Sequence, residues 1–89
     1  MRNEIYKKAI AHFGIKSQLL MAVEEMAELQ KALLKYLRDP MNKENDQNIL
    51  EELADVEITI EQVKLFFHCE NEVSKIKEEK IKRLEGLLR

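Results

Sequence analysis

The chain has 89 residues, a length that suits one domain with a small core. Hydrophobic residues make up 45% and charged residues 36% of it, with only two glycines and one proline, so the composition favours helices over the many turns of a β-protein. The net charge of −2 argues against a general nucleic-acid-binding protein, which is usually basic, and we expect no stable nucleic-acid partner.

The single cysteine, Cys69, excludes an internal disulfide and fits a reducing compartment. No apolar run approaches the ~20 residues that a membrane span requires, and no signal-peptide pattern opens the sequence. We therefore expect a cytoplasmic protein that is soluble and does not bind membranes.

Four helical segments are predicted in chain order. The first covers residues 3–13 and ends at Gly14, a residue that suits the left-handed position after a helix. The second covers residues 17–38, with Ser17 as its N-cap. It ends before Pro40, because the residue that precedes a proline avoids the α region.

A polar loop is expected over residues 41–47, followed by a third helix over residues 48–67. Asn48 is the predicted N-cap of this helix, with Glu51 as its capping-box partner. A short break at residues 68–71 leads to a fourth helix over residues 72–88. The predicted fold class is an all-α helical bundle of four segments.

The bundle is expected to be completed by oligomerisation. A chain of this size buries only about 60–65% of its unfolded surface, so one subunit forms only a small hydrophobic core of its own. Apolar residues also surround much of the second helix, so one chain cannot cover that helix alone. We predict a homodimer or a homotetramer.

Acidic side chains lie inside the apolar faces of the second and third helices. On a helical wheel, Glu25 falls in the middle of one apolar stripe and Glu52 in the middle of another. Glu28 and Asp55 follow them by one turn each. The two stripes are formed by Met21, Leu29, Ala32 and Tyr36 in the second helix and by Ile49, Val56, Thr59, Val63 and Phe66 in the third.

These four carboxylates have the spacing of a metal site. Residues at i and i+3 of a helix lie ~5–6 Å apart, so each pair can converge on one cation. A single such pair usually belongs to a solvated face. Two pairs that are both centred on apolar stripes would meet if the helices packed, and buried carboxylates that repel each other protonate or bind cations. All-carboxylate ligation indicates Mg²⁺ or Mn²⁺.

The two acidic segments also resemble a known family. Glu24-Glu25-Met26-Ala27-Glu28-Leu29 and Glu51-Glu52-Leu53-Ala54-Asp55-Val56 are similar to the E-x-x-E … E-x-x-D signature of MazG-like pyrophosphohydrolases, which belong to the all-α NTP pyrophosphatase superfamily. The similarity covers about residues 13–83 and implies a single domain of this kind over residues 1–89.

This resemblance implies an enzyme with Mg²⁺ as its cofactor, for which Mn²⁺ could substitute. It would hydrolyse a nucleoside or deoxynucleoside triphosphate between the α and β phosphates, giving a nucleoside monophosphate and pyrophosphate. By the same resemblance, Glu25, Glu28, Glu52 and Asp55 would be the metal ligands. Glu24 would hold or activate the attacking water.

Basic side chains are candidates for contact with the phosphates. Lys80 and Arg83 in the fourth helix have a spacing similar to a basic pair on the last helix of many MazG-like proteins. Lys31 and Lys35 follow Glu28 by one and two turns. Each of these side chains could instead lie along apolar surface or pair with a neighbouring acid.

Other functions stay open. The acids could be structural in a non-catalytic helical interaction or regulatory dimer, or the substrate could be phosphoribosyl-ATP or dUTP. A di-iron bundle is disfavoured because such sites use Glu-x-x-His pairs, and neither His12 nor His68 has a glutamate three residues before it. No nucleophile set of the Ser/His/Asp or Cys/His type is evident.

Overall fold

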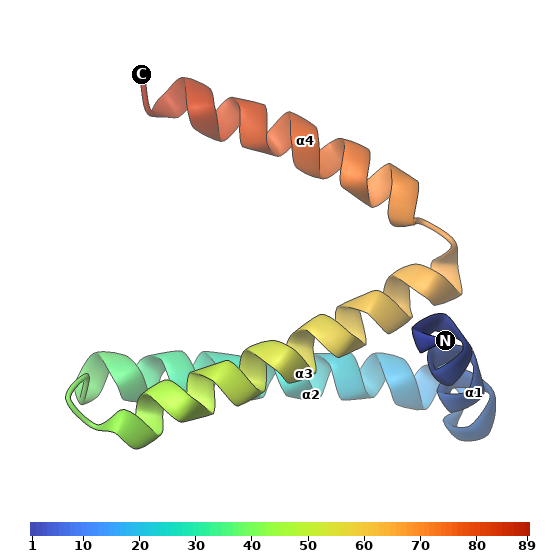
Figure 1. Cartoon of the computed structure of the whole chain (residues 1–89), viewed down its shortest axis with the longest axis horizontal. Helices are drawn as coiled ribbons and strands as arrows, with labels where there is room; N and C mark the ends of the chain where they lie inside the picture. Colours follow the sequence, from blue (N-terminus) through green and yellow to red (C-terminus); the bar gives the residue numbers. More distant parts are fainter.

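The computed structural model describes all residues, 1–89, and contains four α-helices and no strand (Figure 1). The helices are α1 (Arg2–Phe13), α2 (Ile15–Arg38), α3 (Lys43–Phe67) and α4 (Glu70–Leu87). The prediction of an all-α fold with four helical segments is therefore confirmed. None of the four helices has the length and apolar character needed to cross a membrane.

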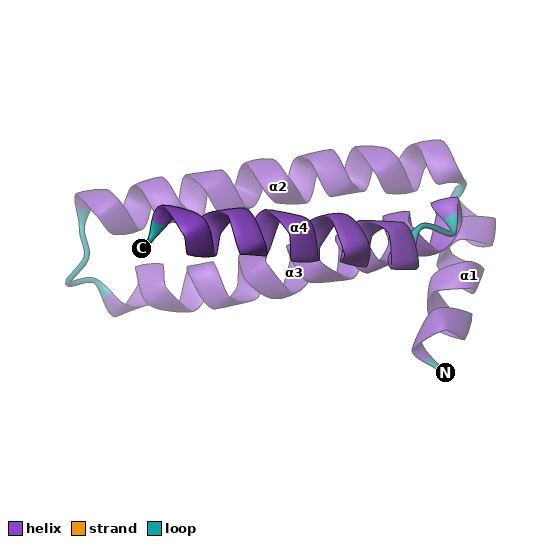
Figure 2. Ribbon diagram, turned by 90° about the horizontal axis from the view of Figure 1, so that it is seen from above, coloured by secondary structure: helices purple, strands orange, loops and turns teal.

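Helices α2 and α3 form a long hairpin that is the framework of the fold. They have 24 and 25 residues and lie side by side in opposite directions (Figures 1 and 2). Helix α1 packs across the end of the hairpin that is far from the α2–α3 loop, against both helices. The Tyr6 hydroxyl donates a hydrogen bond to Glu61 of α3, which fixes α1 in this position.

The core between the helices is thin. Its buried members are Tyr6, Ala22, Ala32 and Val56, with the polar Gln18, Asn45 and Thr59. Ala22 and Ala32, the two buried apolar residues of α2, both have small side chains. No side chain is completely buried, so most of the apolar surface of the hairpin still faces outward.

The α2–α3 turn is shorter than the sequence suggested. The prediction of a loop over residues 41–47 is wrong from Lys43 onward, because α3 begins at Lys43 and not at Asn48. The Asn42 side chain accepts a hydrogen bond from the backbone N–H of Glu44, at 3.0 Å, and so acts as the N-cap. The buried Asn45 amide donates to the carbonyl oxygens at the end of α2, namely those of Lys35 (3.3 Å) and Asp39 (3.0 Å).

Two other helix ends differ from the prediction. Helix α2 begins at Ile15, with Gly14 and not Ser17 at the N-cap position. Gly14 has φ 86° and ψ 150°, a positive-φ conformation that favours glycine but is not the expected left-handed helical one. Helix α4 begins at Glu70, two residues earlier than expected, because His68 takes the left-handed conformation (φ 52°, ψ 44°) and ends α3 within one residue.

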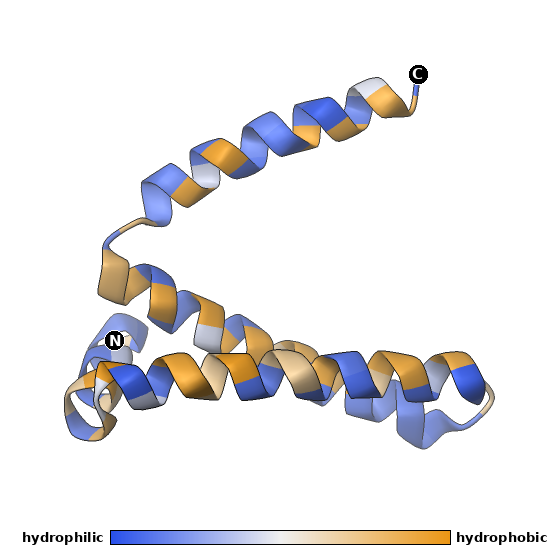
Figure 3. Ribbon diagram, turned by 180° about the vertical axis from the view of Figure 1, so that it is seen from behind, coloured by the Kyte–Doolittle hydropathy of each residue, from blue (hydrophilic) through white to orange (hydrophobic).

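Helix α4 projects away from the rest of the chain. It follows a two-residue linker, His68–Cys69, and forms no packing interface with α1, α2 or α3 (Figure 1). It contains no buried residue. Its apolar side chains, Val73, Ile76, Ile81, Leu84 and Leu87, are all exposed. Apolar residues are also uncovered on the outer face of α2, which is nearest the viewer in Figure 3.

The chain consequently exposes far more surface than a compact monomer of its size. Its accessible surface is 7495 Å², whereas a compact protein of this mass exposes about 5,400 Å². The radius of gyration is 16.0 Å, compared with about 12 Å for a compact chain of this length. The excess is about 2,000 Å² per chain.

Candidate metal centre

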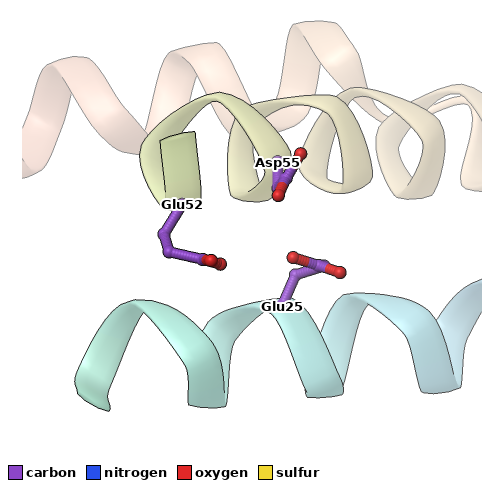
Figure 4. A group of neighbouring side chains, drawn as sticks. All are labelled: Glu25, Glu52 and Asp55. Carbon is purple, nitrogen blue, oxygen red and sulfur yellow. The ribbon is translucent and has the colours of Figure 1, made fainter. Parts of the chain in front are cut away.

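Three carboxylates meet in the gap between α2 and α3. Glu25 points from α2 toward Glu52 and Asp55, which extend from successive turns of α3 (Figure 4). One carboxylate oxygen from each residue can be chosen so that all three lie within 4.8 Å of one another. This span is close to the ~4–5 Å that separates opposite oxygen ligands around Mg²⁺ or Ca²⁺. The helical period and the packing of the hairpin therefore create a set of converging oxygen donors.

The electrostatics of this cluster are unfavourable without a cation. Partial burial and then the negative charges of Asp55 and Glu52 raise the pKa of Glu25. The Oε2 atom of Glu52 is buried and has no hydrogen-bond partner. The ion pairs of the chain involve other acids, so no lysine or arginine neutralises these three. A buried carboxylate oxygen without a donor is costly, and a bound cation would remove that cost.

Glu28 and Glu24 lie outside the group of three. Glu28 is close enough to contribute to the raised pKa of Glu25. Its carboxylate pairs instead with Lys31 at 3.4 Å, and both side chains are largely exposed. Glu24 is exposed on α2. The structure thus brings three of the four predicted ligands together and leaves the fourth at the edge of the cluster.

Two pockets flank the acids along the hairpin. The first, which we call the amide pocket, has a volume of about 250 Å³ and lies toward α1. Its walls are Ala9, Phe13, Gln18, Met21, Glu25, Asp55, Ile58, Thr59 and Gln62. The second, the lysine pocket, has a volume of about 170 Å³ and is lined by Glu28, Lys31, Ala32, Lys35, Asn48 and Glu52. Glu25 and Asp55 line the amide pocket, whereas Glu28 and Glu52 line the lysine pocket. The acidic side chains therefore lie between the two pockets.

The pockets contain residues that the sequence interpretation did not single out. Gln18, Gln62 and Asn48 are polar side chains at the α2–α3 contact. A signal for two of them was present in the sequence. Gln18 lies seven residues before Glu25 and Gln62 lies seven after Asp55, and a separation of seven returns a residue to almost the same helix face.

The predicted phosphate-binding residues separate into two groups. Lys31 and Lys35 line the lysine pocket beside Glu28 and Glu52. A phosphate-binding role at the acids requires this proximity. Lys80 and Arg83 are exposed on α4, which does not pack on the hairpin. Within one chain, these two side chains are therefore not brought to the acids.

A larger pocket of about 320 Å³ lies between α1 and the end of α3. It is lined by Lys7, Ile10, Ala11, Leu65, Phe66 and His68, and it contains none of the acids. It has few polar groups that could orient a ligand. The acidic cluster with its two flanking pockets is therefore the stronger candidate site.

Comparisons of the chain with models of protein families, with curated proteins and with solved structures find no match in any of the three.

Proposed function

We propose that this chain is a Mg²⁺-dependent pyrophosphohydrolase that cleaves a nucleoside or deoxynucleoside triphosphate between its α and β phosphates. The observation that carries the proposal is the convergence of Glu25, Glu52 and Asp55, with a buried oxygen of Glu52 that has no partner. The resemblance of the two acidic segments to MazG-like pyrophosphohydrolases supports the same reaction.

The donor set fits a hard divalent cation. Three carboxylates without nitrogen or sulfur ligands favour Mg²⁺ or Mn²⁺. Glu25, Glu52 and Asp55 would hold the cation. Glu28 would join them once its carboxylate leaves Lys31, at little cost because an exposed i,i+3 pair contributes only a few tenths of a kcal/mol. When bound, the cation neutralises phosphate charge and polarises phosphoryl oxygens.

The remaining roles fall to side chains around the acids. Lys31 and Lys35 supply positive charge in the lysine pocket, where they can bind the phosphates farthest from the sugar. Glu24 orients a water molecule for in-line attack on the α-phosphorus and accepts its proton. Pyrophosphate then leaves toward the lysines, which disperse its charge.

The active form in this proposal is a homodimer or a homotetramer. The excess surface of about 2,000 Å² per chain is in the range that obligate homodimers bury. The apolar face of α4 and the outer face of α2 are the exposed surfaces available for such contacts. If α4 of a second subunit covers the hairpin, its Lys80 and Arg83 also reach the phosphates.

The deciding experiment is a panel of nucleoside and deoxynucleoside triphosphates with Mg²⁺, in which pyrophosphate is resolved from orthophosphate. The panel includes dUTP and phosphoribosyl-ATP, the substrates of the related enzymes considered above. We expect pyrophosphate and a monophosphate. In ¹⁸O-water the label should enter the monophosphate, because attack is at the α-phosphorus. Label in pyrophosphate, or release of orthophosphate, would contradict the proposed bond cleavage.

A second candidate function, a non-catalytic regulatory dimer, is favoured by the exposed apolar face of α4. This alternative predicts a stable dimer with no metal dependence and no turnover of any triphosphate. The same panel, together with metal binding by calorimetry, separates the two functions.

A further inference from the structure

The amide pocket is lined by Gln18, a largely buried residue whose amide pairs with no other group of the chain. Gln18 is only 6% exposed and lies on α2 where α1 and α3 meet it. Its amide forms no hydrogen bond within the chain but is not among the buried groups that lack a partner, so it still reaches solvent, and Gln18 lines the pocket. An amide that pairs with no protein group keeps its donor and its acceptor for a ligand. A ligand in the pocket would replace water as the partner of this amide.

The other walls of the pocket suit a flat heterocyclic ring. Gln62 adds a second amide from α3. The Thr59 hydroxyl donates to the carbonyl of Val56 at 2.9 Å and keeps its lone pairs for a further donor. Phe13 and Met21 provide apolar contact surface. At about 250 Å³, the pocket is smaller than the ~300–1,000 Å³ that holds a whole drug-sized ligand. It therefore suits one ring system and not a complete nucleotide.

The order of the pockets along the hairpin gives the site a direction. The amide pocket shares Glu25 and Asp55 with the acidic cluster, and the lysine pocket shares Glu52 with it. A molecule that spans both pockets must place its neutral, hydrogen-bonding end toward α1. Its anionic end must lie toward the α2–α3 loop, beside Lys31 and Lys35.

We propose that the amide pocket binds the nucleobase of the substrate and that Gln18 determines which base is accepted. This inference rests on the proposed function and adds the orientation of the nucleotide to it. A primary amide presents one donor beside one acceptor, so it pairs with a base edge that offers the complementary acceptor and donor. A triphosphate without a base gains nothing from this pocket.

The test compares the wild type with Gln18→Leu, which keeps the size of the side chain but removes its hydrogen bonds. Gln62→Leu is the second variant. Gln30→Leu, an exposed position on the same helix, is the matched control. For each protein, kcat and KM are measured over the triphosphate panel. Binding of the base-free probe, Mg²⁺ with inorganic tripolyphosphate, is measured by calorimetry.

We expect Gln18→Leu to raise KM for the preferred nucleotide by roughly 10- to 100-fold and to flatten the preference among bases. The affinity for tripolyphosphate should stay within about twofold of wild type, and Gln30→Leu should match wild type. If Gln18→Leu keeps both the wild-type KM and the wild-type base preference, the base-pocket inference is overturned while the proposed function stands. If wild type releases no pyrophosphate from any triphosphate, the proposed function fails and the inference fails with it.

Discussion

The carboxylates of Glu25 on α2 and Asp55 on α3 face each other across the hairpin (Figure 4). Their mutual repulsion, together with that of Glu52, opposes the packing that brings the helices together. The acids therefore destabilise the metal-free protein, and a bound cation would relieve their repulsion.

Mg²⁺ or Mn²⁺ should stabilise the protein, because a ligand that binds only the folded state shifts the unfolding equilibrium. At a hundredfold excess over Kd the gain is about 2.7 kcal/mol, which corresponds to a rise in Tm of about 10–20 °C for a domain of this size. Differential scanning fluorimetry at fixed protein concentration measures it. Glu52→Gln should lose most of this rise, whereas Glu51→Gln, at the exposed neighbouring position, should keep it. If the Tm of the wild type is the same with and without added Mg²⁺ or Mn²⁺, the metal site is excluded.

The metal-free protein should become more stable as the pH falls from 7 toward 4.5. The pKa of Glu25 is raised in the folded state above its ordinary value of 4.5. Between these two pKa values the folded state binds more protons than the unfolded state, so stability decreases as the pH rises through this window. Glu25→Gln should raise the Tm at pH 7 and reduce this part of the pH dependence. Unchanged pH profiles in the variant would show that Glu25 does not titrate in this way.

Glu24→Gln should separate catalysis from metal binding. The side chain lies outside the group of three acids, so the metal-dependent rise in Tm should remain. Loss of a general base typically lowers kcat by about 10²- to 10⁴-fold, and we expect a value in this range. Asp55→Asn, by contrast, should lower both metal binding and turnover. Wild-type kcat in Glu24→Gln would assign the activation of water to another group.

Asn45→Ala should destabilise the α2–α3 turn. The substitution removes both hydrogen bonds to the end of α2 and leaves the carbonyl oxygens of Lys35 and Asp39 without this donor. We expect a loss of about 1–3 kcal/mol, measured by chemical denaturation with metal chelated. Asn71→Ala, an exposed asparagine on α4, is the control and should change stability little. Equal stability of the two variants would show that the Asn45 amide does not hold the turn.

Leu84→Glu should weaken self-association. Leu84 lies on the exposed apolar face of α4, and a charge on a surface that becomes buried is costly. Light scattering at micromolar concentration should report a dimer or tetramer for wild type and a smaller species for the variant. Lys75→Glu, on the opposite side of the same helix, is the control for added negative charge. A wild-type protein that is a monodisperse monomer would exclude the proposed assembly.

The helical fold and the main components of the candidate site can be predicted from the amino-acid sequence. The 3.6-residue period of the apolar residues predicts helices of the observed type, and the same period reveals that Glu25 and Glu52 lie within apolar faces. The stop before Pro40 is also local, because it follows from steric restriction of the preceding residue, and α2 ends at Arg38 as predicted.

Which side chains meet depends on how the helices pack against each other. Helix α3 begins at Lys43, where Asn42 is the N-cap and the Asn45 amide bonds across the turn to the end of α2. The same packing brings Glu25 to Asp55, leaves Glu28 with Lys31 and places Gln18 in the wall of the amide pocket. Periodicity fixes the face on which a side chain lies, whereas the crossing and register of the two helices fix its distance from the partner. For that reason the ligands could be proposed from the sequence, while the two pockets and their order along the hairpin could not.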